Sequence, residues 1–424
     1  MSQAAGAHTR LDVMNFLNEI SARFPAAISF ASGRPAQQFI HLQQWMGAGA
    51  RFVDYFADEK RMPEEQAYHL LGQYGNTNGI INGLIARQVR HDHGIACLAG
   101  EVLVTAGGQE AIDLCVRQLC SEPGDVLLAR TPTYIGATGV ADLHGIEIAG
   151  FRCDDEADMA DALAAAVARL EQHGKRPRAL YLVPDFDNPS ASVLSYATRM
   201  QLIAYCAAQG IVVLEDNPYG MFRYEGETIP PMYALDSHGC VVFLGTYSKT
   251  ICPALRVGFA IVPERMLQGQ VCGKQVMAQL SQAKSFSTLN TSQVSQAIVG
   301  GILLDQQCSL RASIEPAVAY YRGNRDTMLA CLDSAFKEWP QQITWNVPQG
   351  GFFLVLKLPF DFGAEEADIC ARQFGVIVMP LSFFALAPGH ERHVRLAFSN
   401  VGEEAIAEGV KRFAAFVRQR LQGQ

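Results

Sequence analysis

A lysine among small hydroxyl residues follows directly on an apolar run. The apolar run is Cys240–Leu244 (CVVFL), and the segment after it, Gly245–Arg256 (GTYSKTICPALR), contains Lys249. A lysine amine becomes nucleophilic when burial or a nearby cation lowers its pKa, and it can then form an imine with an aldehyde cofactor. Arg256 could bind a phosphate of that cofactor in a forked contact. The segment predicts covalent cofactor binding, and its alternative is an ordinary surface lysine.

A pair of glycines lies between an apolar run and a helical pattern at Thr105–Glu110 (TAGGQE). Glycine lets the backbone approach an anion closely. The amides of Gly108 and Gln109 would then point from a helix N-terminus toward a phosphate. The alternative interpretation of this segment is a tight turn without a ligand.

A carboxylate stands at the end of another apolar run, in Glu215–Gly220 (EDNPYG). A buried carboxylate is costly unless it is paired. The protonated nitrogen of a pyridine ring would pair with Asp216 and remain positive, so that the ring could accept electrons from a carbanion. Tyr219 could donate a hydrogen bond to the 3-oxygen of the same ring. A turn is also expected here, because Asp-Asn-Pro favours turns.

Two further loops contribute candidates of the same kind. Asn188, held extended by the proline that follows it, could bind the 3-oxygen from its other side. Tyr134 could stack its aromatic face on a flat ring. A polar loop and a packing tyrosine are the alternatives. The five segments together supply different needs of one cofactor, and this agreement favours a site over five unrelated turns.

Apolar strands alternating with helical patterns place these segments. This alternation predicts an α/β fold with a mainly parallel sheet between helices, whose strand carboxyl ends form the ligand site. The predicted strands are Glu101–Thr105, Asp125–Ala129, Ala179–Val183, Ile211–Leu214, Cys240–Leu244 and Val257–Val262.

The C-terminal third has an α+β pattern, which predicts a second, smaller domain. We expect residues 1–64 to form an N-terminal arm and part of the small domain. Residues 65–305 would form the large cofactor-binding domain, and residues 306–424 the C-terminal small domain.

The composition excludes several classes of protein. The net charge of -8 argues against nucleic-acid binding, which usually needs a basic face. The 11 cysteines form no CxxC pair or zinc-ligand spacing, so we expect reduced thiols and no metal. Neither a signal peptide nor an apolar run long enough to span a membrane is found, so a cytoplasmic location is the expectation.

Together these motifs resemble the class I/II aminotransferases, which depend on pyridoxal 5'-phosphate and have the fold type I architecture. The resemblance is strongest to the kynurenine/α-aminoadipate aminotransferase branch, and it extends from about Ile28 to the C-terminus. It implies that Lys249 is the imine lysine and proton carrier, and that Asp216 pairs with the pyridine nitrogen. Tyr219 and Asn188 would hold the 3-oxygen.

The resemblance also implies roles for residues outside these motifs. Thr246 would join Gly108, Gln109 and Arg256 at the phosphate, beside the stacked Tyr134. Tyr74 in QYGNTNG would reach the phosphate in a neighbouring subunit, which implies a homodimer. Arg395 in HVRLAFS would bind the substrate α-carboxylate, near Asn188 and Gly33.

The chain departs from the family at two places. It reads NPSA instead of NPTG at Asn188–Ala191, and it has Arg34 in the segment ASGRP. For Arg34 we consider two interpretations, contact with an acidic or polar substrate side chain and a plain surface position.

The expected reaction is a ping-pong transfer of an amino group between an L-amino acid and a 2-oxo acid, with Lys249 as general base. The motifs serve the cofactor, so a lyase, decarboxylase or oxidase of the same fold is an alternative. A ligand-sensing domain of a transcription regulator is a non-enzymatic alternative. It is disfavoured by the acidic charge and by the roughly thirty residues before the domain, too few for a winged helix.

Overall fold

A computed structural model of the chain describes residues 13, 19–153, 155–264, 266–267, 271–339 and 341–422. Most of the predicted N-terminal arm before residue 19 lies outside these described residues. None of the described helices is both long and apolar enough to cross a membrane.

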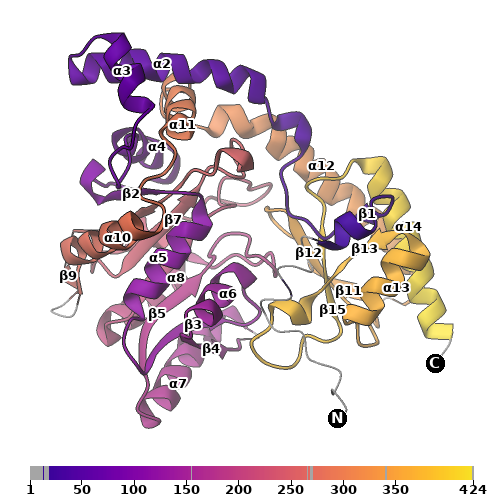
Figure 1. Ribbon diagram of the computed structural model, residues 1–424. Coiled ribbons are helices and arrows are strands. Elements are labelled where there is room, and N and C mark those ends of the chain that lie inside the picture. The colour runs from indigo at the N-terminus through magenta and orange to yellow at the C-terminus, as the bar shows by residue number, and fades with distance from the viewer. Residues whose placement is uncertain are drawn as a thin grey trace, which may run out of the picture.

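A seven-stranded sheet forms the centre of the larger part of the molecule, at the left of Figure 1. Its strand order is β2-β8-β7-β6-β5-β3-β4, in which β8 runs antiparallel to both neighbours and all other pairs are parallel. The predicted mainly parallel sheet is therefore confirmed. Its strands are β2 (Val102–Thr105), β3 (Asp125–Arg130), β4 (Glu147–Phe151), β5 (Arg176–Leu182), β6 (Val212–Asp216), β7 (Val241–Thr246) and β8 (Gly258–Ile261).

Helices pack on both faces of this sheet. Successive side chains of a strand point to opposite faces, and in β2 Val102 and Val104 join one apolar cluster whereas Leu103 joins another. The burial of alternate residues on different helices explains why the strands are apolar throughout. The helices of this part are α2 (Leu42–Lys60), α3 (Glu64–Leu71), α4 (Asn82–His93), α5 (Gly108–Leu119), α6 (Ile135–Leu143), α7 (Met159–Gln172), α8 (Tyr196–Gln209), α9 (Met232–Leu235), α10 (Gly273–Ser287) and α11 (Gln293–Asp305).

Helix boundaries follow local sequence rules. The side chain of Ser195 accepts a hydrogen bond from the amide of Thr198 at 3.2 Å and so caps the start of α8. Gly210 follows the last residue of α8 with φ 67°, a left-handed conformation that glycine adopts without strain. In α5, the buried residues recur at helical spacing, which turns one face of the helix toward the sheet.

The C-terminal part, orange to yellow in Figure 1, contains a four-stranded antiparallel sheet of order β11-β12-β15-β14. This arrangement confirms the predicted smaller α+β unit, whereas the predicted domain limits at residues 64 and 305 stay predictions. The strand β1 (Ile28–Ser29) pairs in parallel with β13 (Val376–Ile377) beside this unit. The remaining elements are β9 (Met266–Leu267), β10 (Val271–Cys272), α12 (Arg311–Phe336), β11 (Thr344–Trp345), β12 (Phe353–Lys357), α13 (Ala364–Phe374), β14 (Met379–Pro380), β15 (His393–Ala397) and α14 (Glu403–Gln422).

Candidate functional site

A cavity of about 330 Å³ lies where the carboxyl ends of β5, β6 and β7 face β12 and β15. Every predicted site residue except Tyr74 lines this cavity, although the residues come from segments spread over most of the chain. They are Gly33, Arg34, Gly108, Gln109, Tyr134, Asn188, Asp216, Tyr219, Thr246, Lys249, Arg256 and Arg395.

Lys249 follows β7 and places its amine inside the cavity. Its Nζ donates a hydrogen bond to the carbonyl of Gly33 at 2.9 Å and lies 5.9 Å from the centre of the Tyr219 ring. Burial lowers the pKa of Lys249 to about 8, opposed by Asp216 and assisted by the positive charges of Arg256, Arg34 and Arg395. A lowered pKa raises the fraction of neutral, nucleophilic amine near neutral pH.

Asp216 is the last residue of β6, and its side chain is buried. The hydroxyl of Tyr181 donates to its carboxylate at 2.6 Å from the neighbouring strand β5. Burial raises the pKa of Asp216 to about 6, while the Tyr181 bond and the charge of Lys249 lower it and Asp187 raises it. A cationic partner in the cavity would therefore strongly stabilise the ionised carboxylate of Asp216.

Arg395 on β15 is buried between aromatic rings at the other side of the cavity. Its guanidinium carbon lies 4.4 Å from the ring centre of Phe353 and 4.6 Å from that of Phe384. It donates to Asn188 Oδ1 at 2.5 Å and to the carbonyl of Ala31, whereas its buried Nε has no hydrogen-bond partner among the described residues. Burial lowers the pKa of Arg395 to about 10. Such a cation in an apolar setting favours an incoming carboxylate.

Tyr219 reaches the cavity from the turn after β6. Its ring packs edge-on against Phe352 and Phe353, with ring centres 5.2 Å and 5.7 Å away. Burial raises the pKa of Tyr219, so that its hydroxyl remains a hydrogen-bond donor. The same cause raises the pKa of Tyr134 to about 12.

A cradle for an anion lies at the N-terminus of α5. Gly107 adopts φ +79°, and a Cβ at this position would lie 2.2 Å from an amino group of Arg256. Arg256 donates to the carbonyl of Ala106 at 3.2 Å and to Ser248 Oγ at 3.4 Å, and Thr246 donates to the same Ser248 oxygen at 3.0 Å. Hydroxyls, a guanidinium and free helix amides thus surround a small space, which fits a phosphate.

Tyr134 and Gln109 form one wall together. The hydroxyl of Tyr134 donates to Gln109 Oε1 at 3.4 Å, and Gln109 Nε2 donates to the carbonyl of Gly136 at 2.8 Å. These contacts hold the side chain of Gln109 against the start of α6. The glycine cradle, the amine of Lys249 and the buried carboxylate of Asp216 line one cavity and together fit pyridoxal phosphate.

Gly33 and Arg34 form the wall nearest the small sheet. A Cβ on Gly33 would lie 2.2 Å from the ring of Phe353, so a larger residue would displace that ring. Arg34 is exposed and lines the cavity, which is compatible with both interpretations of its role. Tyr74 lies outside the cavity of its own chain and is 84% exposed.

The sequence alone did not point to Tyr181, Ser248, Phe353 or Phe384. Tyr181 lies inside an apolar strand, where a tyrosine normally indicates packing. It pairs with Leu214, two residues before Asp216 on the neighbouring strand, so an alignment of the two strands could have identified it. Ser248 stands next to Lys249 and could have been included with Thr246.

A second cavity of about 880 Å³ lies on the other side of the Asn217–Gly220 turn. Among the described side chains, no group of three or more His, Cys, Asp or Glu could hold a metal.

The comparisons with known proteins agree with this geometry. Residues 30–413 match the model of the family described as aminotransferase class I and II. An (S)-3,5-dihydroxyphenylglycine transaminase from Amycolatopsis orientalis is 35% identical over 408 residues, which are 96% of this chain and 92% of the relative. An aromatic-amino-acid aminotransferase from Thermococcus litoralis is 30% identical over 368 residues, 85% of this chain and 83% of the relative.

A solved structure is similar over almost its full length. It is an α-aminoadipate aminotransferase from Thermus thermophilus in complex with N-(5'-phosphopyridoxyl)-L-leucine. It is 27% identical, has a TM-score of 0.79, and 96% of each chain is covered. The predicted resemblance to this branch is confirmed, as is the fold type I architecture. The chain belongs to the class I and II aminotransferases and is an enzyme that transfers amino groups with pyridoxal phosphate as its cofactor.

Proposed function

We propose that the enzyme moves an amino group from an L-amino acid to a 2-oxo acid in a ping-pong cycle that depends on Lys249. The observation that carries this proposal is the placement of Lys249 and Asp216 in one cavity, with a phosphate cradle at one side and Arg395 at the other. When bound, pyridoxal phosphate supplies an electron sink for the substrate α-carbon.

Lys249 would bind the cofactor aldehyde and, once released, would carry a proton. Its pKa of about 8 supports this role, because a neutral amine is available to remove the α-proton of the substrate and, once protonated, can give the proton back. Asp216 would keep the pyridine nitrogen protonated. Tyr219 and Asn188 would donate hydrogen bonds to the 3-oxygen, and the Nδ2 group of Asn188 is available for this because Arg395 binds its Oδ1.

The phosphate would be bound by the amides of Gly108 and Gln109 and by the side chains of Thr246 and Arg256. Support comes from the cradle of Gly107, where any side chain would meet Arg256. Ser248 would join this set, because it already links Thr246 to Arg256. Tyr134 would stack on the ring.

Arg395 would bind the substrate α-carboxylate with its unpartnered Nε and its forked amino groups. We infer that L-amino acids with an aromatic side chain are the preferred donors. Ile135, Phe353 and Phe384 give the cavity apolar walls, and two relatives are named for aromatic substrates. Arg34 would add a contact to a polar or acidic group of the substrate, beside Gly33.

We also infer a cytoplasmic homodimer that binds neither nucleic acid nor membrane. Tyr74 would reach the phosphate in the partner's cavity. Its 84% exposure supports this role, as do exposed apolar side chains from neighbouring segments, which a second subunit would cover. These are Tyr68, Leu70, Phe286, Leu289 and Val294.

The direct test replaces Lys249 with alanine. Lys249→Ala should abolish turnover and the visible absorbance of the protein with added pyridoxal phosphate, because Lys249 is the one lysine among the described residues that line the cavity. Lys274→Ala, at an exposed lysine of α10, should leave both unchanged. Steady-state activity in Lys249→Ala would contradict the proposal.

The reaction type and the donor require a second experiment. Purified enzyme is mixed with single amino acids, with and without a 2-oxo acid, while the visible spectrum and oxygen uptake are recorded. Transamination should convert the spectrum fully without oxygen uptake, and repeated turnover should need the 2-oxo acid.

Aromatic amino acids should react fastest, and Arg34→Ala should slow polar and acidic donors only. An unchanged preference in Arg34→Ala would remove that role.

A further inference from the structure

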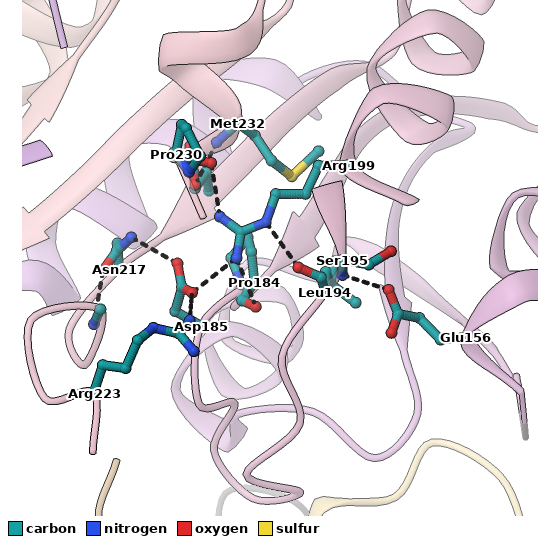
Figure 2. A network of polar contacts seen from close by, with 12 residues as sticks. Glu156, Pro184, Asp185, Leu194, Ser195, Arg199, Asn217, Arg223, Pro230 and Met232 are labelled. Carbon is teal, nitrogen blue, oxygen red and sulfur yellow. Dashed lines mark hydrogen bonds and ion pairs between the residues drawn. The ribbon is translucent and has the colours of Figure 1, made fainter. Parts of the chain in front are cut away.

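A buried arginine outside the cavity holds together the loops that carry its cofactor residues. Figure 2 shows Arg199 at the centre of this network. Arg199 on α8 is fully buried, and its guanidinium donates to the carbonyl of Leu194 at 3.0 Å and that of Pro230 at 3.0 Å. It also reaches the carbonyl of Pro184 at 3.3 Å and the carboxylate of Asp185 at 2.8 Å. One side chain thus connects both ends of the loop after β5 to the loop after β6.

Asp185 is the point at which two loops meet. Its Oδ1 accepts from Arg199 and, at 3.3 Å, from Arg223. Its Oδ2 accepts from Asn217 Nδ2 at 3.5 Å. Asp185 follows β5 and Asn217 follows β6, so the carboxylate ties the loop after one strand to the turn after the next (Figure 2).

Each of the two connected loops carries a residue that would hold the 3-oxygen. Asn188 stands three residues after Asp185 in the same loop. Asn217 directly follows Asp216, and its Oδ1 accepts from the amide of Gly220 at 2.9 Å, which closes the turn that contains Tyr219. Asp185 itself lines the second, larger cavity and not the cofactor cavity.

A buried ion pair contributes little net stability, because desolvation offsets the attraction between its charges. Its use is better explained by geometry. Side chains that act on one atom must keep their relative positions closely, and Asn188 and Tyr219 come from different strands. We propose that the Arg199–Asp185–Asn217 network is a positioning device that sets the spacing between Asn188 and Tyr219 around the 3-oxygen. This inference rests on the proposed function.

The test uses two variants of the full-length enzyme reconstituted with pyridoxal phosphate. Asp185→Asn removes the charge with little change of shape. Asn217→Ser keeps an oxygen that can accept from Gly220 but is too short to reach Asp185. The readout is the pH midpoint of the visible absorption of the enzyme. Both variants should raise this midpoint by about half a unit or more. Weaker hydrogen bonds to the 3-oxygen stabilise its anionic form less, so the bound cofactor should lose its proton at a higher pH.

Asp125→Asn is the matched control. Asp125 is also a buried carboxylate paired with an arginine, at 3.0 Å from Arg176, but it lies at the opposite end of the sheet, at the start of β3. It should lower the melting temperature as Asp185→Asn does and leave the midpoint unchanged. The positioning role is overturned if Asn217→Ser, or a folded Asp185→Asn, keeps the midpoint of the unmodified enzyme. A colourless unmodified enzyme would instead remove the proposed function and this inference together.

Discussion

Two adjacent carboxylates at the end of β6 have different tasks because a strand turns them to opposite faces. Glu215 accepts hydrogen bonds from the amides of Met232 and Tyr233, both at 2.8 Å, and so holds the chain below the sheet. Asp216 faces the cavity and accepts from Tyr181. Burial raises the pKa of both, to about 7 and about 6. Because burial destabilises the ionised carboxylate of Asp216, a cation that pairs with it in the cavity would be bound more strongly.

Tyr181→Phe tests this arrangement. The Tyr181 hydroxyl lowers the pKa of Asp216, so its loss should raise that pKa further. Because the ionised carboxylate is the active form, the acid limb of the pH profile of kcat/KM should move to higher pH by about one unit. Tyr205→Phe, at a half-buried tyrosine of α8 outside the cavity, should leave the profile in place. An unshifted acid limb in Tyr181→Phe would exclude a role for this hydrogen bond.

Glu215 predicts how stability depends on pH. Its pKa is raised in the folded protein, so it contributes stability below its unfolded pKa of about 4 and loses that contribution as the pH rises to about 7. Between pH 4 and 8, the unmodified protein should therefore lose about 3 kcal/mol of unfolding free energy more than Glu215→Gln. Denaturant unfolding of the cofactor-free proteins at several pH values measures the difference. Equal losses in both proteins would contradict the prediction.

At the scale of elements, α2 and α11 cross at a contact that allows no side chain. A Cβ on Gly301 would lie 1.8 Å from the carbonyl oxygen of Ala48, and one on Gly300 would lie 2.5 Å from the ring of Phe52. The glycines of α11 therefore let the two backbones approach closely. The crossing supports the segment that carries Tyr74, because Gln293 at the start of α11 donates to the carbonyl of Leu70 at 2.9 Å.

Gly301→Ala should destabilise the protein by about 1–3 kcal/mol, since the added methyl group must push the helices apart. Gly83→Ala is the control. It is also a helical glycine, in α4, but it is exposed and has no atom within 4 Å of the added Cβ. It should stabilise the protein by about 0.5–1 kcal/mol through helix propensity. Chemical denaturation compares the two, and equal effects would contradict the packing argument.

Apolar runs predicted the elements around the site well. The predicted strand Glu101–Thr105 corresponds to β2, and Gly108 and Gln109 do begin a helix. The strand β4 was not predicted, because at this edge of the sheet its residues are mostly half-exposed and show no continuous apolar run. The antiparallel direction of β8 was also beyond the pattern, since a short buried strand looks the same in both directions.

The residues that line the candidate site were easier to predict than the residues that hold them in place. Lys249 and Asp216 stand at or just after strand ends, within short local motifs that indicate a site. Arg199 and Tyr181 lie within a helix and a strand, and their importance appears only when distant segments are brought together. Hydrogen bonds between loops have no periodicity that a single sequence could reveal.

At the scale of the whole molecule, the proposed homodimer predicts complementation between inactive variants. Lys249→Ala loses the amine, and Tyr74→Ala would lose a phosphate contact in the partner's cavity. A mixed dimer of the two would have one cavity with both groups intact. Co-expression in equal amounts should therefore restore roughly a quarter of the normal activity, if subunits pair at random. The separately purified variants are the controls, and no gain on co-expression would place Tyr74 in its own subunit's cavity or in none.

The pairing of β1 with β13 joins Ile28 to Val376. During synthesis, the first strand must therefore wait for its partner until most of the chain has left the ribosome. Arg395 adds a similar delay, because it binds Ala31 and Asn188 from near the C-terminus. A nascent chain that stops before this arginine has no complete site, and closing so long a loop is a slow step. Translation products that end before Arg395 should thus lack the group proposed to bind the substrate carboxylate, and they should remain inactive even with added pyridoxal phosphate.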